Sequence, residues 1–326
     1  MAMRYPLERR SNMRHISLPL VRAGVLLVTC GFLTACAHQA LDLDAVNAFA
    51  TTTAEAEQSF SDIAADFYAS CVRSHQMSFK SAPVVDPDCT QSKADSKSWA
   101  DANEIVISYV KALGDLAGGS STTSDYGIPA LSTQLTTSGV LNTTQTQAVQ
   151  TFATDAVNVI LAAERREALA GKMQQANASL KSVLDTLKTI ASTYYVKNQL
   201  GFEHDQLVDF FGYNLVAPKK LGLEQIQLFE YKADYAQLQV ALSNKVDASA
   251  AYVSALGTIG DTHDQLLQSV QSQNLGAAVA AQAAAINQLV PDLITLQRAF
   301  QPVTFQPVPF PPVRTVVPGG ANAYNG

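Results

Sequence analysis

The chain has 326 residues, of which 47% are apolar and 15% charged, and its formal net charge is −6 at neutral pH. The apolar content is enough for a hydrophobic core, and the length suits one large domain or two small ones. The acidic balance and the lack of a basic stripe argue against a nucleic-acid partner, because phosphate binding needs clustered lysine and arginine.

The N-terminal segment 1–35 has the pattern of a secretory signal. Five arginines, opposed by Glu8 alone, precede an apolar run that begins at 23–28. This run is too short for a lasting transmembrane helix, which needs about 20 apolar residues. A basic start, a short apolar core and small residues at the cleavage point are typical of export signals. Met13 is an alternative start, since the segment from there onward has the full pattern.

The four residues Leu33, Thr34, Ala35 and Cys36 resemble the lipobox of bacterial lipoproteins, which has an aliphatic residue, two small residues and a cysteine. The resemblance implies a diacylglycerol on the Cys36 sulfur, cleavage before this cysteine and acylation of the new amine. Two or three acyl chains anchor a protein stably, whereas one binds marginally. Because Ala37 follows instead of aspartate, the resemblance favours the outer membrane, with the chain facing the periplasm. The alternatives are an ordinary signal with a chance cysteine and a buried core cysteine.

Cysteine usage agrees with export. Cys30 leaves with the signal and Cys36 takes the lipid, which leaves Cys71 and Cys89 in an oxidising compartment. We predict a disulfide between these two, closing a loop of about 20 residues and worth about 3 kcal/mol. The alternatives are two free thiols or a metal pair, for which His75 is the only imidazole nearby.

Removal of the first 35 residues changes the charge balance. Lysine plus arginine falls from 22 to 17 and aspartate plus glutamate from 28 to 27, so the net charge becomes −10. Anionic lipid headgroups would repel such a body, and we therefore expect the acyl chains alone to hold it at the membrane.

The remaining chain predicts an all-α fold, an elongated antiparallel bundle of long, coiled-coil-like helices, because apolar periods near 3.5 dominate. The first helix is expected over 43–73 and the second over 92–117. A polar, glycine-rich loop should follow over 118–144, with a short turn around 128–135. The apolar rows of the first two helices are Val46, Phe49, Thr53, Ala56, Phe60, Ile63 and Phe67, then Trp99, Ala102, Val106, Tyr109, Leu113 and Leu116.

A third helix is predicted over 144–197, with a seam interrupted at Arg166 and Asn177. At 1.5 Å per residue it would be about 75 Å long. An aromatic junction over 198–222, broken by glycines and a proline, is expected to cap one end of the bundle. The apolar seam of the third helix contains Val149, Phe152, Ala156, Val159, Ala163, Ala170, Met173, Leu180, Leu184, Leu187, Ala191 and Tyr194.

The fourth helix is expected over 223–256, ending at Gly257 and Gly260. A short helix over 261–273 and a last one over 275–300 should follow. Tyrosines in the third and fourth helices are expected in the core rather than in a ligand cage. They are Tyr194, Tyr195, Tyr231 and Tyr235.

The C-terminal segment 301–326 differs in character, because prolines alternate there with valine and phenylalanine. It should be extended and polyproline-like. Either it docks on its own bundle through Phe305 and Phe310, or it extends as a ligand for a partner. The chain thus divides into a signal over 1–35, a helical domain over 36–300 and this tail.

A repeated tetrapeptide offers the one candidate ligand cluster. His204 and Asp205 recur as His263 and Asp264, and each copy follows a glycine by three residues. If the two copies met in space, imidazole and carboxylate could bind a metal. The alternative is two helix starts, with a capping box opened by Thr262 in the second copy.

Catalytic patterns are missing from the sequence. No serine lies in a strand–turn–helix elbow, and no glycine-rich phosphate loop follows a strand, so neither an enzyme nor a cofactor is predicted. Five acids, expected on solvated helix faces, are Glu164, Glu167, Glu203, Glu224 and Glu230.

Together these features predict a non-catalytic outer-membrane lipoprotein that binds another protein, as a scaffold, an adaptor or an immunity factor. A periplasmic protein that binds a metal or small ligand through the two His–Asp pairs is the second hypothesis. An enzyme with an unusual active site is the third.

Overall fold

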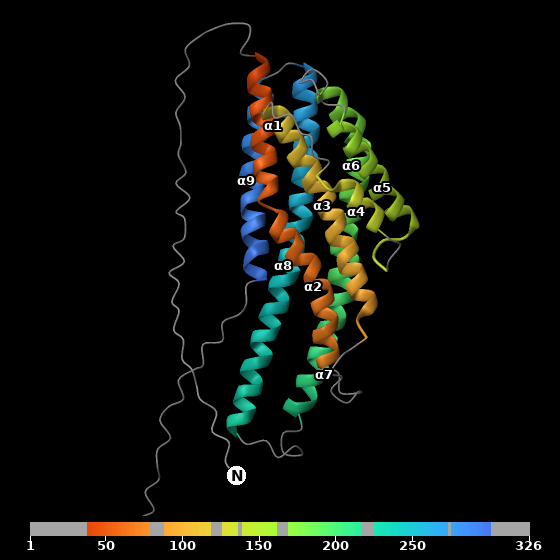
Figure 1. The fold of residues 1–326 in the computed structure, drawn as a ribbon. Coiled ribbons are helices and arrows are strands. Elements are labelled where there is room, and N and C mark those ends of the chain that lie inside the picture. The colour runs from red at the N-terminus through yellow and green to blue at the C-terminus, as the bar shows by residue number, and fades with distance from the viewer. Residues whose placement is uncertain are drawn as a thin grey trace, which may run out of the picture. The chain divides into compact units, whose positions relative to one another are not determined.

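The computed structural model describes residues 38–77, 88–118, 126–135, 139–161, 169–216, 225–272 and 275–300 (Figure 1). Within these ranges the chain is all-α, without a strand, and the helices pack against one another, as predicted. The lipobox-like residues with Cys36, the charged run with Arg166 and the tail 301–326 lie outside the described residues. None of the described helices combines the length and the apolar composition that a membrane crossing requires.

The first predicted helix is formed by α1 (His38–Ala54) and α2 (Glu57–Gln76). The prediction of a single helix over 43–73 is wrong in one respect, because a turn separates α1 from α2. In this turn the Ala56 N–H donates to the Thr53 carbonyl, three residues back instead of four. The a/d stripe continues across this turn and is buried as predicted: Val46, Phe49, Thr53, Ala56, Phe60, Ile63 and Phe67.

The second predicted helix is confirmed as α3 (Thr90–Gly118), which packs against α1 and α2. Gly114 lies where α1 comes closest, and a Cβ at this position would collide with that of Ala50. The short helix α4 (Ile128–Gln134) occupies the expected turn and starts after Gly127, whose φ of 73° favours glycine. The predicted apolar face of α3 is buried throughout: Trp99, Ala102, Val106, Tyr109, Leu113 and Leu116.

The third predicted helix, over 144–197, is wrong as a single rod. Instead, α5 (Thr143–Leu161) and α6 (Leu169–Thr189) pack side by side. Ser179 donates a 2.7 Å hydrogen bond to Asp155, although 24 residues of straight helix would separate them by about 36 Å. The chain therefore reverses its direction between Leu161 and Leu169. The buried seam residues are Val149, Phe152, Ala156, Val159, Met173, Leu180, Leu184, Leu187 and Ala191.

The interruption predicted over 198–222 is also wrong at its start. From α6 the chain passes through a π-helix, η2 (Ile190–Leu200), directly into α7 (Gly201–Val216). Gly201 keeps helical backbone angles, φ −60° and ψ −45°, and so does not break the chain.

The fourth predicted helix does not stop at its glycines, because α8 (Gln225–Ser272) runs through both Gly257 and Gly260. A Cβ on Gly260 would come within 3.0 Å of Leu184 Cδ1, so the missing side chain lets α8 pack closely on α6. α9 (Leu275–Ala299) then runs back along α8 and ends part of the way along it (Figure 1).

One polar cluster in the core is neutral and joins three helices. Trp99 Nε1 donates a 2.9 Å hydrogen bond to the Tyr252 hydroxyl, which donates at 2.5 Å to Asn103 Oδ1. Asn103 in turn donates through Nδ2 to the Phe60 carbonyl at 3.0 Å. Since all of these groups are buried, each hydrogen bond avoids the cost of an unsatisfied polar atom.

Candidate functional site

The structure does not bring the two His–Asp pairs together into a ligand cluster. His204 and Asp205 lie on α7 with side chains 51% and 78% exposed, and their own Nδ1–Oδ1 distance is 3.5 Å. His263 is fully buried inside α8, and Asp264 forms an ion pair with Lys181 at 2.7 Å. The capping box predicted at the second copy is wrong as well, because that copy lies in the middle of α8.

His263 has both ring nitrogens occupied by protein partners. Its Nδ1 lies 3.2 Å from Asn177 Oδ1, and its Nε2 lies 3.0 Å from the Tyr109 hydroxyl. The Asn177 oxygen only accepts, so Nδ1 carries the proton and Nε2 accepts from Tyr109. Burial lowers the pKa of His263 to about 4, more than the nearby Asp264 raises it. The side chain is therefore a neutral core residue at neutral pH, with no free nitrogen for a metal.

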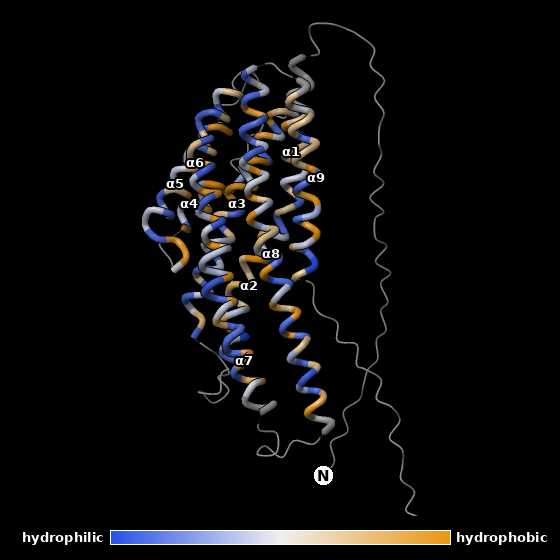
Figure 2. The backbone as a smooth tube through the Cα atoms, turned by 180° about the vertical axis from the view of Figure 1, so that it is seen from behind, coloured by the Kyte–Doolittle hydropathy of each residue, from blue (hydrophilic) through white to orange (hydrophobic). Residues whose placement is uncertain are grey.

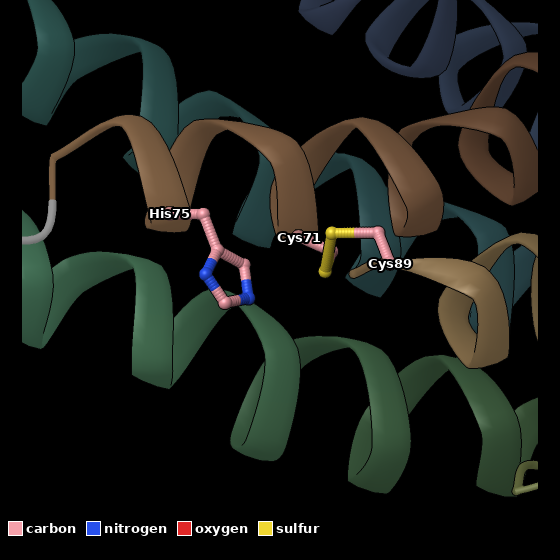
Figure 3. Close-up of side chains that lie close together, drawn as sticks. All are labelled: Cys71, His75 and Cys89. Carbon is pink, nitrogen blue, oxygen red and sulfur yellow. A yellow bond between two sulfur atoms is a disulfide. The ribbon is translucent and has the colours of Figure 1, made fainter. Parts of the chain in front are cut away.

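The predicted disulfide between Cys71 and Cys89 is present, with a Cα–Cα distance of 6.0 Å. Figure 3 shows His75 one turn along α2 from Cys71, beside the same bond. One His75 ring nitrogen and the two sulfurs lie within 4.8 Å of one another. Among the described residues, no other three side chains of histidine, cysteine, aspartate or glutamate bring their ligand atoms this close. Because the metal-binding form of cysteine is the thiolate, the disulfide leaves only the imidazole as a ligand.

The π-helix η2 shifts which tyrosine faces the core. Each π-type hydrogen bond spans five residues instead of four, as in the bond from the Gly201 N–H to the Val196 carbonyl. The heptad count predicts Tyr194 in the core, but the longer turn brings Tyr195 inward, which is fully buried while Tyr194 is half-buried. π-Helical segments occur frequently at functional sites, which makes the contacts of Tyr195 relevant to function.

Tyr195 reaches a group of four charged side chains, Asp66 and Arg73 on α2, Glu203 on α7 and Lys245 on α8, which we name the charge cluster. Arg73 contacts both acids, with Nη1 2.8 Å from Asp66 Oδ1 and Nε 2.6 Å from Glu203 Oε1. Lys245 Nζ lies 3.0 Å from Asp66 Oδ1. Two acids and two bases balance, which makes the charge cluster formally neutral.

Every carboxylate oxygen of the charge cluster accepts a hydrogen bond. Tyr195 donates to Asp66 Oδ2 at 2.7 Å, and Ser70 donates to Glu203 Oε2 at 2.5 Å. Arg73 Nη2 adds bonds of 2.9 Å to Asp66 and 3.0 Å to Glu203. Buried charges persist only when they are paired and satisfied in this way. The charge cluster therefore fastens α2, η2, α7 and α8 at one point.

The pKa directions agree with this geometry. Burial opposes ionisation of Asp66, yet the hydrogen bonds from Arg73 and the attraction of Lys245 outweigh it, so the pKa of Asp66 lies below its ordinary value. Burial likewise works against the Arg73 cation, but hydrogen bonds to Glu203 and Asp66 raise the pKa of Arg73. For Lys245 burial outweighs the attraction of Asp66 and lowers the pKa.

An open pocket of about 340 Å³ is lined by residues of η2, α7 and α8, and we name it the α7–α8 pocket. Its size falls at the lower end of the range for small-ligand sites. The lining is mostly apolar, and His204 is the one titratable side chain in it. The lining residues are Val196, Leu200, Gly201, His204, Gln239, Leu242, Ser243 and Val246.

Exposed apolar side chains concentrate on the same two helices. Among the described residues, six of the eight large apolar side chains that are exposed belong to α7 and the N-terminal half of α8: Phe202, Val208, Phe229, Leu238, Val240 and Val246. Single exposed apolar residues need no explanation, whereas large apolar patches are typical of interaction surfaces in general. In Figure 2 apolar segments continue along α8 beyond the end of α9.

Four of the residues on α8 form a regular row, Phe229, Ala233, Ala236 and Val240, which we name the α8 stripe. Their spacing of four, three and four residues places them on one face of the helix. Phe229 is 68% and Val240 60% exposed, Ala236 is exposed, and Ala233 is half-buried. A 3–4 spacing is that of a helix–helix seam, yet no described helix covers this part of the face.

The charge cluster was not predicted from the sequence, and Glu203 was wrongly placed on a solvated face. One signal was present: Asp66 and Arg73 lie seven residues apart, so they share the edge of the predicted a/d stripe. Comparison of the chain with protein-family models, curated proteins and solved structures finds no match.

Proposed function

We propose that this chain is a lipoprotein, anchored through Cys36 and facing the periplasm at the outer membrane. There it acts as a non-catalytic scaffold, adaptor or immunity factor that binds another protein. The resemblance of residues 33–36 to a lipobox supports the anchor, and the Cys71–Cys89 disulfide is compatible with an oxidising compartment. Antiparallel pairs such as α5–α6 and α8–α9 support an elongated, coiled-coil-like bundle.

The α8 stripe is the observation that supports protein binding. Its apolar residues recur at seam spacing, while the same helix buries its apolar residues farther along. An amphipathic helix from a partner could cover the stripe through its own apolar positions, as in other helix-binding surfaces.

The anchor is tested by the substitution Cys36→Ser in the full chain. Metabolic labelling with palmitate should mark the wild-type protein in the membrane fraction and leave the variant unlabelled and unprocessed. Cys71→Ser is the matched control, because it removes a cysteine outside the lipobox and should keep the label. Label on the Cys36→Ser protein, or none on the wild type, would refute lipidation.

Protein binding is tested with a photoreactive amino acid in place of Val240, activated in living cells. We expect one discrete adduct with a different protein. Val290 on α9, an apolar residue that is also exposed, is the control position and should give no such adduct. Equal adducts at both positions, none at Val240, or an adduct of twice the chain's own mass would contradict a specific partner.

A small ligand in the α7–α8 pocket is the second candidate function, favoured by its apolar lining around His204. A metal held jointly by His204 and His263 is not part of this hypothesis, because both ring nitrogens of His263 already have protein partners. The hypothesis predicts that only changes in the pocket, such as Leu242→Ala, alter binding of apolar probes. Equal probe binding by wild type and Leu242→Ala would exclude it.

A further inference from the structure

The uncovered α8 stripe continues a face of α8 that α9 covers. Ser254 lies 14 residues beyond Val240, close to four whole turns, and so points in the same direction as the stripe. The Asp292 side chain of α9 is hydrogen-bonded to Ser254. Because only two residues join α8 to α9, the two helices are antiparallel and α9 runs back toward the stripe.

This register fixes where the chain leaves α9. Phe300 lies eight residues after Asp292 on α9. Because the helices are antiparallel and rise equally per residue, it lies level with Val246, eight residues before Ser254 on α8. Phe300 is half-buried against the core. Figure 1 shows α8 extending well past this end of α9. Phe300, the last described residue, therefore lies where the uncovered part of the face begins.

From this placement we propose that the chain's own segment 301–312 covers the α8 stripe in an extended conformation. The prolines at 302, 307 and 309 prevent α9 from continuing as a helix and favour the polyproline form. Extended at about 3.1 Å per residue, eight residues span about 25 Å, which matches the 17 helical residues from Val246 to Phe229 at 1.5 Å each.

The chemistry of this segment fits the stripe. No charged residue occurs before Arg314, and the segment alternates proline with valine and phenylalanine. Ala233 and Ala236 are small, so the stripe is low between the larger Phe229 and Val240 and can accept a ring such as that of Phe305. Polyproline segments bind apolar surfaces at low entropic cost because they are already extended.

The tail is favoured over a second copy or a free partner because it is tethered at Phe300. A tether of a few residues gives an effective concentration in the millimolar range, far above that of a separate chain. A partner helix would have to displace the segment. This competition between the segment and a partner helix rests on the proposed function, whereas the covering of the α8 stripe by the segment does not.

The test uses the purified full chain with a photoreactive amino acid in place of Phe305. We expect a product of monomer mass whose cross-linked peptide lies within 229–246. Val240→Glu should lower its yield about tenfold, because a carboxylate in an apolar contact costs more than about 1.4 kcal/mol. The matched control Val290→Glu should leave the yield unchanged. Circular dichroism confirms that both variants keep their helices.

The outcomes separate the alternatives. Cross-links that map elsewhere, or that Val240→Glu does not reduce, would overturn the proposal, and a product of twice the monomer mass would assign the stripe to a second copy. If Phe305 cross-links to the stripe but Val240 captures no other protein in cells, the covering stands and the proposed function fails. If Val240 captures a partner and Phe305 forms no link to α8, the proposed function stands and the covering by the tail fails.

Discussion

The two halves of α8 have the same apolar spacing but different surroundings. In the C-terminal half, Tyr252 and His263 are fully buried and form neutral hydrogen bonds with other helices. In the N-terminal half, only Leu242 is buried among the described residues 228–247. At the boundary Lys245 enters the charge cluster. A single helix can therefore be buried at one end and uncovered at the other, and its neighbours decide which.

The two kinds of polar contact also differ in energy. Neutral buried hydrogen bonds each add modestly to stability, whereas a buried charge cluster costs desolvation that its internal attractions must offset. Removing one charge leaves the others uncompensated, which is why we expect the largest losses at the boundary between the halves.

The largest expected effect is that of Arg73→Met. It leaves the carboxylates of Asp66 and Glu203 buried without their shared cation, although Lys245 still contacts Asp66. We expect the free energy of unfolding in urea to fall by about 3 kcal/mol. Lys111→Met, which breaks an exposed ion pair with Glu57, is the control and should cost no more than about 0.5 kcal/mol. Equal losses would show that the charge cluster is not a fastening point.

The next effect is a pH dependence carried by His263, whose folded pKa is about 4 against an ordinary 6.5. The unfolded chain binds the proton first as the pH falls, so stability is lost between pH 6.5 and 4 and is fully present above 6.5. At pH 4.5 the loss should reach about 2.5 kcal/mol. The lowered pKa of Asp66 acts below its ordinary value of 3.8, outside this window.

The measurement compares unfolding free energies at pH 7 and pH 4.5 for wild type and His263→Gln. The variant loses some stability at both values because the buried contacts change, but its difference between the two pH values should shrink by about 2.5 kcal/mol. His204→Gln is the control, since that imidazole is exposed. An unchanged difference in His263→Gln would mean that His263 is not neutral and buried.

A smaller effect is expected from Tyr252→Phe in the C-terminal half. The Trp99 Nε1–H loses its acceptor and Asn103 Oδ1 loses its donor. Leaving such buried groups unsatisfied should cost about 1.5 kcal/mol in thermal or urea unfolding. Tyr235→Phe removes a hydroxyl that accepts only from Gln239 at the surface and should change little. A loss larger than that of Arg73→Met would show that the neutral hydrogen bonds of Tyr252 stabilise the fold more than the charge cluster does.

Sequence patterns predicted the parts of the fold that depend on local spacing. The seven-residue rows from Val46 to Phe67 and the face from Trp99 to Leu116 are buried as expected, because helices with a regular apolar row pack along it. The Cys71–Cys89 pairing followed from counting the cysteines that remain after the predicted signal is removed.

The features that the sequence did not predict depend on contacts between distant segments. The sequence between α5 and α6 has high helix propensity, so the interruption of the seam at Arg166 did not by itself predict two separate helices. The π-helix moves the buried position from Tyr194 to Tyr195, a shift that heptad counting cannot detect. Glu203 is buried because residues 130 and more positions away, Arg73 and Ser70, meet it.

The smallest expected effect is that of Leu238→Ala in the N-terminal half, paired with Leu256→Ala in the C-terminal half. The two substitutions are chemically identical and lie on one helix, but Leu238 is 37% exposed and Leu256 fully buried. The first should lower the free energy of unfolding by about 0.5 kcal/mol and the second by about 3 kcal/mol. If Leu238→Ala costs as much as Leu256→Ala at both low and high protein concentration, a segment of the same chain must cover Leu238. A loss at Leu238 that grows with protein concentration would instead mean that a second copy shields this half of α8.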